Sequence, residues 1–101
     1  MSTLVASTTA DAVKYVKDNL ERLGELRYIE HSRNSNKIEY KTIIVGEIND
    51  LVIEGGLGSG YTGEGPSGLL KVLILLGIDN ETANKLVYEN TQNTYTFKHE
   101  F

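Results

Sequence analysis

Seven of the chain's ten glycines lie in one fourteen-residue segment, residues 55–68, and this segment constrains the fold more than any other feature. Glycine weakens regular structure and adopts backbone angles that other residues avoid, so the segment is predicted to be an irregular loop. Pro66 suits the first position of a helix, and leucine-rich sequence follows it as far as Gly77. The loop therefore leads into a short helix, and because that helix is apolar nearly all round we expect it to be buried.

The first half of the chain shows one helical pattern and three strand patterns. Residues 8–24 carry apolar side chains at helical spacing between a capping threonine and a glycine, which predicts a helix. Residues 26–29, 38–45 and 51–53 are rich in β-branched and aromatic side chains and are separated by turn residues. They predict a meander of three strands that begins with a hairpin.

Two more elements are predicted after Gly77. Asp79 can cap a further helix, and residues 95–101 alternate between aromatic and polar side chains as a strand does, although a helix continued over residues 87–101 is the alternative. The predicted fold is a single α+β domain over residues 1–101 in the order αβββααβ. It has an antiparallel sheet with helices packed on one face, and residues 1–7 form a flexible N-terminus.

Charge and composition exclude several functional classes. The formal net charge of −4 repels nucleic-acid phosphates, so direct nucleic-acid binding is not expected. The chain has no cysteine, which excludes a disulfide framework and a thiolate metal site and fits a reducing compartment. The N-terminus lacks the basic and apolar parts of a signal peptide, and the longest apolar run, residues 69–76, is too short to span a membrane. A cytoplasmic location is predicted.

The glycine segment contains a G-x-G-x-x-G pattern, residues 58–63, between a predicted strand and a predicted helix. One interpretation is structural: the glycines let a tight loop cross the sheet and dock the helix closely. The other is that loop amides and the helix N-terminus hold anionic oxygens, while Tyr61 stacks on a ring and Glu64 accepts hydrogen bonds from hydroxyl or amine groups. The candidate ligand-binding residues are Gly58, Ser59, Gly60, Tyr61, Thr62, Gly63, Glu64, Gly65, Ser67 and Gly68.

Basic groups for such a ligand must come from outside the glycine segment. Residues 42–70 contain no Lys or Arg, and the lysine of a Walker-type phosphate loop is missing. The candidate basic contacts lie on the predicted hairpin or on another subunit; on the hairpin they are Arg27, Arg33, Lys37 and Lys41.

The glycine segment also contains a distinctive turn sequence, Gly60-Tyr61-Thr62-Gly63-Glu64-Gly65-Pro66, which is followed by the predicted leucine-rich helix. It resembles the Gly-Tyr-Gly-Gly-x-Gly-Pro turn of small uncharacterised proteins found in phages, plasmids and prokaryotic genomes. The match covers about residues 57–88 and differs at Ser59, where the family pattern has an aromatic residue, and at Thr62, where it has glycine. The resemblance implies a mobile-element context, and the host cytoplasm as location, rather than a particular chemistry.

No catalytic or metal-binding pattern accompanies the glycine segment. His31 and His99 have no helical partner that would complete a metal site, so neither a metal nor a cofactor is expected. His31 lies beside a polar turn and is expected to be solvated, whereas His99 is expected to be packed or half-exposed. Aromatic residues at alternating strand positions can also form a subunit interface, which favours a homo-oligomer.

Two functions of different classes follow from these features. The first is a non-catalytic cytoplasmic binder of phage type that sequesters an anionic, nucleotide-like ligand, such as a host immune signal, in a counter-defence role. The alternative is an acidic protein–protein inhibitor of a host nuclease or CRISPR effector, of the anti-CRISPR type. An enzyme that uses Glu64 or His99 is a third and less favoured hypothesis.

Overall fold

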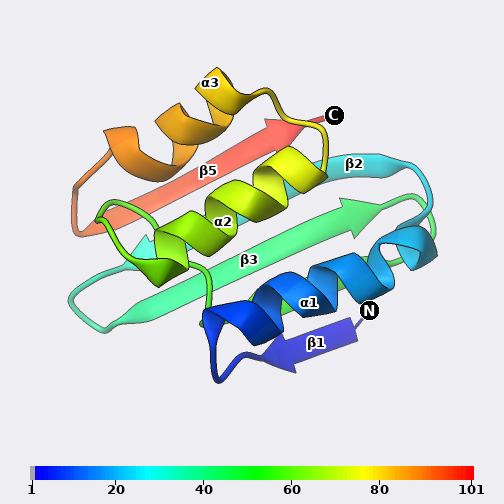
Figure 1. Ribbon diagram of the computed structural model, residues 1–101, viewed down its shortest axis with the longest axis horizontal. Helices are drawn as coiled ribbons and strands as arrows, with labels where there is room; N and C mark the ends of the chain where they lie inside the picture. Colours follow the sequence, from blue (N-terminus) through cyan, green and yellow to red (C-terminus); the bar gives the residue numbers. More distant parts are fainter. Residues whose placement is uncertain (1) are drawn as a thin grey trace.

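The computed structural model describes residues 2–101, which form one five-stranded sheet with the helices layered on one of its faces (Figure 1). The order across the sheet is β1-β4-β3-β2-β5, with β1 and β4 parallel and the other neighbours antiparallel. The small single-domain α+β fold is confirmed, but the sheet is mixed and not purely antiparallel. The strands are β1 (Ser2–Val5), β2 (Leu26–Asn34), β3 (Glu39–Gly46), β4 (Asp50–Glu54) and β5 (Thr94–Glu100).

The first strand is the element that the sequence did not predict. We expected residues 1–7 to be a flexible N-terminus, yet β1 pairs with β4, with Ser2 opposite Leu51 and Val5 opposite Glu54. The backbone N–H of Ala6 extends this contact by donating to the carbonyl of Glu54 at 2.8 Å. The order of elements is therefore βαβββααβ in place of αβββααβ; Met1 lies outside the described residues.

The first helix has the ends that the sequence predicts. Helix α1 (Thr9–Asn19) is capped by the Thr8 hydroxyl, which accepts a hydrogen bond from the Asp11 amide at 3.1 Å. It continues as one 3₁₀ turn, η1 (Leu20–Leu23), and ends at Gly24 with a φ of 71°. Such an angle favours glycine because it has no Cβ.

The second helix begins earlier than predicted. Helix α2 (Glu64–Leu75) starts two residues before Pro66, which therefore occupies its third position. Proline is tolerated there because the first four N–H groups of a helix have no partner within it. We expected this helix to be buried all round, but Ile74 is 45% exposed and Leu75 39% exposed. One side of α2 packs on the sheet, and these two residues lie on another.

The last helical segment changes its hydrogen-bonding pattern along its length. Helix α3 (Asn80–Asn84) is capped by Asp79, whose carboxylate accepts from the Thr82 amide at 3.0 Å. It continues directly as a π-helical turn, η2 (Lys85–Glu89). The chain then returns as β5, so the prediction of a terminal strand is confirmed.

The hydrophobic core lies between the sheet and the helical layer. Ile29, Ile44 and Ile53 reach it from three strands, and Val16, Leu69 and Leu73 meet them from α1 and α2. No helix among residues 2–101 covers the other face of the sheet (Figure 1). None of the helices in that range has the length and apolar character that crossing a bilayer requires.

Candidate functional site

The glycine segment consists of a buried inner part and an exposed tip. Leu57, Gly58 and Ser59 are buried beneath the helical layer, whereas the chain is exposed from Tyr61 to Glu64. The tip lies at the end of the molecule where α2 begins (Figure 1). A ligand can therefore reach only part of the predicted binding segment.

Four buried polar residues, here called the buried polar cluster, connect the segment to the sheet: His31, Arg33 and Thr42 on the strands, and Ser59 in the segment itself. The His31 ring joins two hydroxyls, with Nδ1 2.9 Å from Thr42 Oγ1 and Nε2 3.0 Å from Ser59 Oγ. Arg33 Nη1 donates to the same Ser59 oxygen at 3.0 Å. These bonds attach the glycine segment to β2 and β3.

Arg33, a predicted ligand contact, is instead a structural residue. The residue is 4% exposed, and its guanidinium lies 4.9 Å from the centre of the Tyr95 ring. Its Nε donates to the Gln92 carbonyl at 3.0 Å, and its Nη2 donates to Asn90 Oδ1 at 2.7 Å. Carbonyl and hydroxyl oxygens satisfy the charge, and no carboxylate within residues 2–101 forms an ion pair with it. Arg33 thus fixes the connection between η2 and β5.

The expectation that His31 is solvated is wrong. The ring is fully buried between Thr42, Ser59 and Phe97, whose ring centroid lies 5.6 Å away. Burial, together with the positive charge of Arg33, lowers the pKa of His31 to about 4. At neutral pH the imidazole is therefore uncharged, so one ring nitrogen donates while the other accepts, and the two hydroxyls take the complementary roles.

The contact between Ser59 and His31 has the spacing of a nucleophile and its general base. Both side chains are buried, with Ser59 1% exposed, so a substrate would have to displace the loop to reach them. The hydroxyl is also engaged by Arg33. The contact therefore holds the loop to the sheet.

Two of the amides that were predicted to cradle an anion have partners inside the protein. Gly60 N donates to the Val87 carbonyl at 2.8 Å, and Ser67 N donates to the Gly63 carbonyl at 3.1 Å. At Gly60, whose φ is 80°, a Cβ would lie 2.3 Å from Arg33 Nη1. The inner loop thus matches the structural interpretation of the glycines.

An open groove of about 490 Å³ lies between α1 and α2 and is here called the lysine groove. The two helices meet tightly beside it, because a Cβ on Gly68 would lie 2.2 Å from Thr9 Cγ2. Its lining residues are Thr9, Ala10, Val13, Lys14, Lys17, Glu64, Ser67, Gly68 and Lys71.

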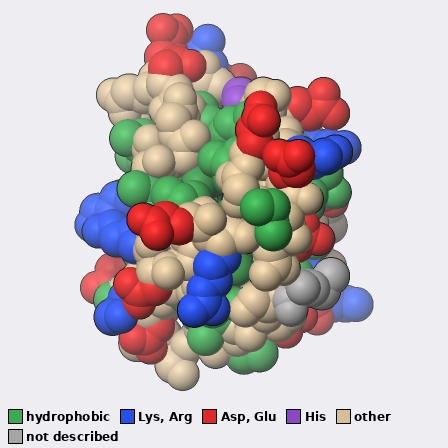
Figure 2. Space-filling model, turned by 90° about the vertical axis from the view of Figure 1, so that its right-hand side faces the viewer, with side chains coloured by type: hydrophobic (Ala, Val, Ile, Leu, Met, Phe, Trp, Pro, Cys, Tyr) green, Lys and Arg blue, Asp and Glu red, His purple; other side chains and the backbone are tan. Residues whose placement is uncertain are grey.

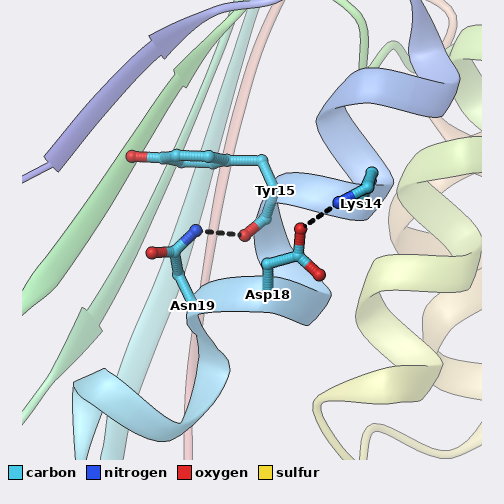
Figure 3. A network of polar contacts seen from close by, with 4 residues as sticks. All are labelled: Lys14, Tyr15, Asp18 and Asn19. Carbon is cyan, nitrogen blue, oxygen red and sulfur yellow. Dashed lines mark hydrogen bonds and ion pairs between the residues drawn. The ribbon is translucent and has the colours of Figure 1, made fainter.

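The groove is a local concentration of positive charge on a chain of net charge −4. Lys14 pairs with Asp18 one turn along α1 (Figure 3), and that hydrogen bond and charge raise the pKa of Lys14. Among residues 2–101 no carboxylate lies within ion-pair distance of Lys17 or Lys71. In Figure 2, where the helical layer is on the left, basic side chains lie along its outer margin with acidic ones beside them.

The structure does not bring the predicted ligand-binding residues together in one site. Glu64, Ser67 and Gly68 line the lysine groove, whereas Ser59 belongs to the buried polar cluster. Tyr61 packs against Tyr40, with ring centroids 6.3 Å apart, and burial raises its pKa.

The predicted basic contacts do not gather at the glycine segment. Arg27 lines a groove with Glu47 and Phe101 near the start of β2, Lys37 lies in the turn between β2 and β3, and Lys41 lies on β3. The three groove lysines were missed because they lie on other segments. The spacing of Lys14 and Lys17 by three residues, which places both on one helix face, is the signal that indicates them.

Residues 2–101 contain no group of three His, Asp or Glu side chains placed to share one metal ion. Comparison of the chain with protein-family models, curated proteins and solved structures found no match in any of the three. The resemblance to small phage and plasmid proteins therefore stays a prediction, and the functional argument rests on the geometry of the chain itself.

Proposed function

We propose that the protein is a non-catalytic binder of a small anionic ligand and that the lysine groove is its binding site. The observation that carries the proposal is the convergence of Lys14, Lys17 and Lys71, from two helices, on one groove of about 490 Å³. Ligand pockets in proteins commonly have volumes of about 300–1,000 Å³. Lys17 and Lys71, which have no carboxylate partner among residues 2–101, are available to an anion.

The lining favours a phosphorylated ligand. Ammonium groups bind phosphate as point charges, and the Glu64 carboxylate can accept a hydrogen bond from a ligand hydroxyl or amine. Val13 and the lysine stems supply apolar contact, but no aromatic ring is among the lining residues, so the site is built for phosphate and not for stacking a base. Nucleotides still fit this site, because their phosphates can bind the lysines. The role that we propose is sequestration of such a phosphorylated signal in counter-defence.

Calorimetric titration with ATP and with inorganic triphosphate, at low and high salt, tests the proposal. We expect both ligands to bind, and their affinity to fall with salt because exposed charges are screened. The double substitution Lys17→Gln/Lys71→Gln removes two ammonium groups and should weaken binding about tenfold, since each contributes roughly 0.5–1 kcal/mol.

The matched control is Lys85→Gln/Lys98→Gln, which removes the same charge from lysines that lie outside the groove. It should change affinity less than about twofold if the groove, and not the overall charge, determines binding. Equal loss in the two double variants, or no binding of either ligand by the wild-type protein, would refute the proposal.

The alternative of an acidic inhibitor ranks second. It requires a continuous acidic surface that meets a basic partner. On the face shown in Figure 2, acidic, basic and hydrophobic side chains are interspersed. A pull-down at low salt with a basic nuclease remains its test.

A further inference from the structure

The turn between β2 and β3 holds an isoleucine in an unfavourable backbone conformation. Ile38 has a φ of 54° and is the one non-glycine residue among residues 2–101 with a positive φ. The left-handed region suits glycine and asparagine, whereas a β-branched side chain there is strained. The side chain of Ile38 is also 82% exposed, so it contributes little to the protein's own core.

The backbone of this turn does not need isoleucine. Lys37 N donates to Asn34 Oδ1 at 3.3 Å, and Ser35 N donates to the Asn93 carbonyl at 2.8 Å. These bonds involve no side-chain atom of Ile38. Backbone strain of this kind concentrates at functional sites, which favours a contact between this side chain and another molecule.

A groove of about 470 Å³ lies at the base of the same hairpin. Ser32 and Lys41 face each other across β2 and β3, Lys41 faces Glu54 across β4, and Asn34 faces Glu39. These residues alternate along their strands with buried residues such as Arg33 and Thr42, so they lie on the face of the sheet that no described helix covers. The turn that links β2 to β3 lies at the left of Figure 1.

We propose that this end of the sheet is a homodimer interface, in which Ile38 of each copy enters the groove at the base of the other copy's hairpin. A two-fold interface uses the same patch on both subunits, so the patch must contain both the projecting group and its receptor. In this protein the projecting group, Ile38, and the receptor groove both belong to the β2–β3 hairpin and the neighbouring strand β4. Charge also fits, because Lys37, beside Ile38, would meet Glu39 and Glu54, which outnumber Lys41, the one exposed cation among the described residues of the groove lining.

Sedimentation velocity of the full chain over a concentration series tests the interface. We expect a monomer–dimer equilibrium that Ile38→Asn weakens about tenfold or more, since the substitution removes the central apolar contact. Asparagine tolerates the left-handed conformation, so the monomer should melt no earlier than the wild type. The matched control is Ile48→Asn in the turn between β3 and β4, where Ile48 is 76% exposed with ordinary backbone angles; it should leave the dimer intact.

A charge exchange identifies the neighbours of Ile38. Lys37→Glu and Glu54→Lys should each weaken the dimer, because each places like charges opposite each other. The double variant should restore the dimer, because the two opposite charges are exchanged and still attract. A wild-type protein that stays monomeric at high concentration, or equal dimerisation of the Ile38 and Ile48 variants, overturns the proposal. Failure of the double variant to restore the dimer overturns the assigned pairing.

Discussion

The buried polar cluster and the lysine groove both use residues of the glycine segment, but they treat positive charge in opposite ways. In the cluster, Arg33 is 4% exposed and directs its donors to carbonyl and hydroxyl oxygens of the protein. In the groove, Lys17 and Lys71 are exposed and reach no carboxylate among residues 2–101. The buried arginine therefore stabilises the fold, whereas the two exposed lysines have no ion-pair partner among the described residues and are accessible to a ligand.

This comparison shows why polar residues beneath a glycine-rich loop do not by themselves make a binding site. A buried polar group must be hydrogen-bonded to offset its lost hydration, and once it is bonded it has nothing left for a ligand. Substitutions in the buried polar cluster should therefore change stability. Substitutions in the lysine groove should change binding alone.

The largest effect is expected at Gly60, next to the cluster. In Gly60→Val a β-branched side chain must adopt a φ near 80° with its Cβ 2.3 Å from Arg33 Nη1. Strain and displacement of the buried arginine should lower the free energy of unfolding by about 4 kcal/mol. Urea denaturation measures the loss.

Gly63→Ala is the control for Gly60, because Gly63 is exposed and has extended backbone angles that alanine can adopt. It should cost less than about 1 kcal/mol. A similarly small cost at Gly60 would show that the buried polar cluster does not hold the loop.

The second-largest effect is expected in the pH dependence of the free energy of unfolding, through protonation of His31. Its pKa is about 4 in the folded protein, against an ordinary value of 6.5. Between these values the unfolded chain binds a proton that the folded chain does not, so stability is complete above about pH 6.5 and falls as the pH is lowered toward 4. The loss should reach about 2 to 3 kcal/mol.

Urea unfolding of wild type and His31→Gln at several pH values measures this contribution. The variant is less stable at pH 7, and its stability should change less between pH 6.5 and 4 because it lacks the titrating ring. Parallel profiles for the two proteins would mean that the ring titrates alike in the folded and unfolded chains.

The smallest effect is expected in the lysine groove. Because Lys17 and Lys71 are exposed and form no ion pair with the described residues, Lys17→Gln/Lys71→Gln should change the free energy of unfolding by less than about 0.5 kcal/mol. Thermal unfolding without ligand checks this. A loss above about 1 kcal/mol would make the lysines structural and remove the contrast between the two regions.

Elements with strong local signals were predicted from the sequence, and those that depend on distant partners were not. The cap at Thr8, the glycine at position 24 and the turn between β2 and β3 are encoded by neighbouring residues, so α1 and the hairpin were predicted. Strand β1 has four residues, too few for a pattern, and is defined by its pairing with β4. Its existence depends on a contact across some fifty residues of chain.

The site shows the same division. The groove lining includes three predicted candidates from the glycine segment, Glu64, Ser67 and Gly68. Lys71 lies just beyond that segment and Lys14 lies on another helix, so neither was a candidate. Their convergence follows from the packing of α1 against α2, for which no local pattern exists. The burial of His31 likewise depends on Ser59, which is 28 residues away in sequence.

The bonds of Arg33 also bear on the order in which the chain folds. They join β2 to Ser59, 26 residues away, and to Asn90, 57 residues away. Contacts between residues that are far apart in sequence require loop closure, so we expect these bonds to form late, after the transition state for folding. Interactions that are absent from the transition state slow unfolding without accelerating folding. We therefore expect Arg33 to lengthen the lifetime of the native state by slowing unfolding, with little effect on the folding rate.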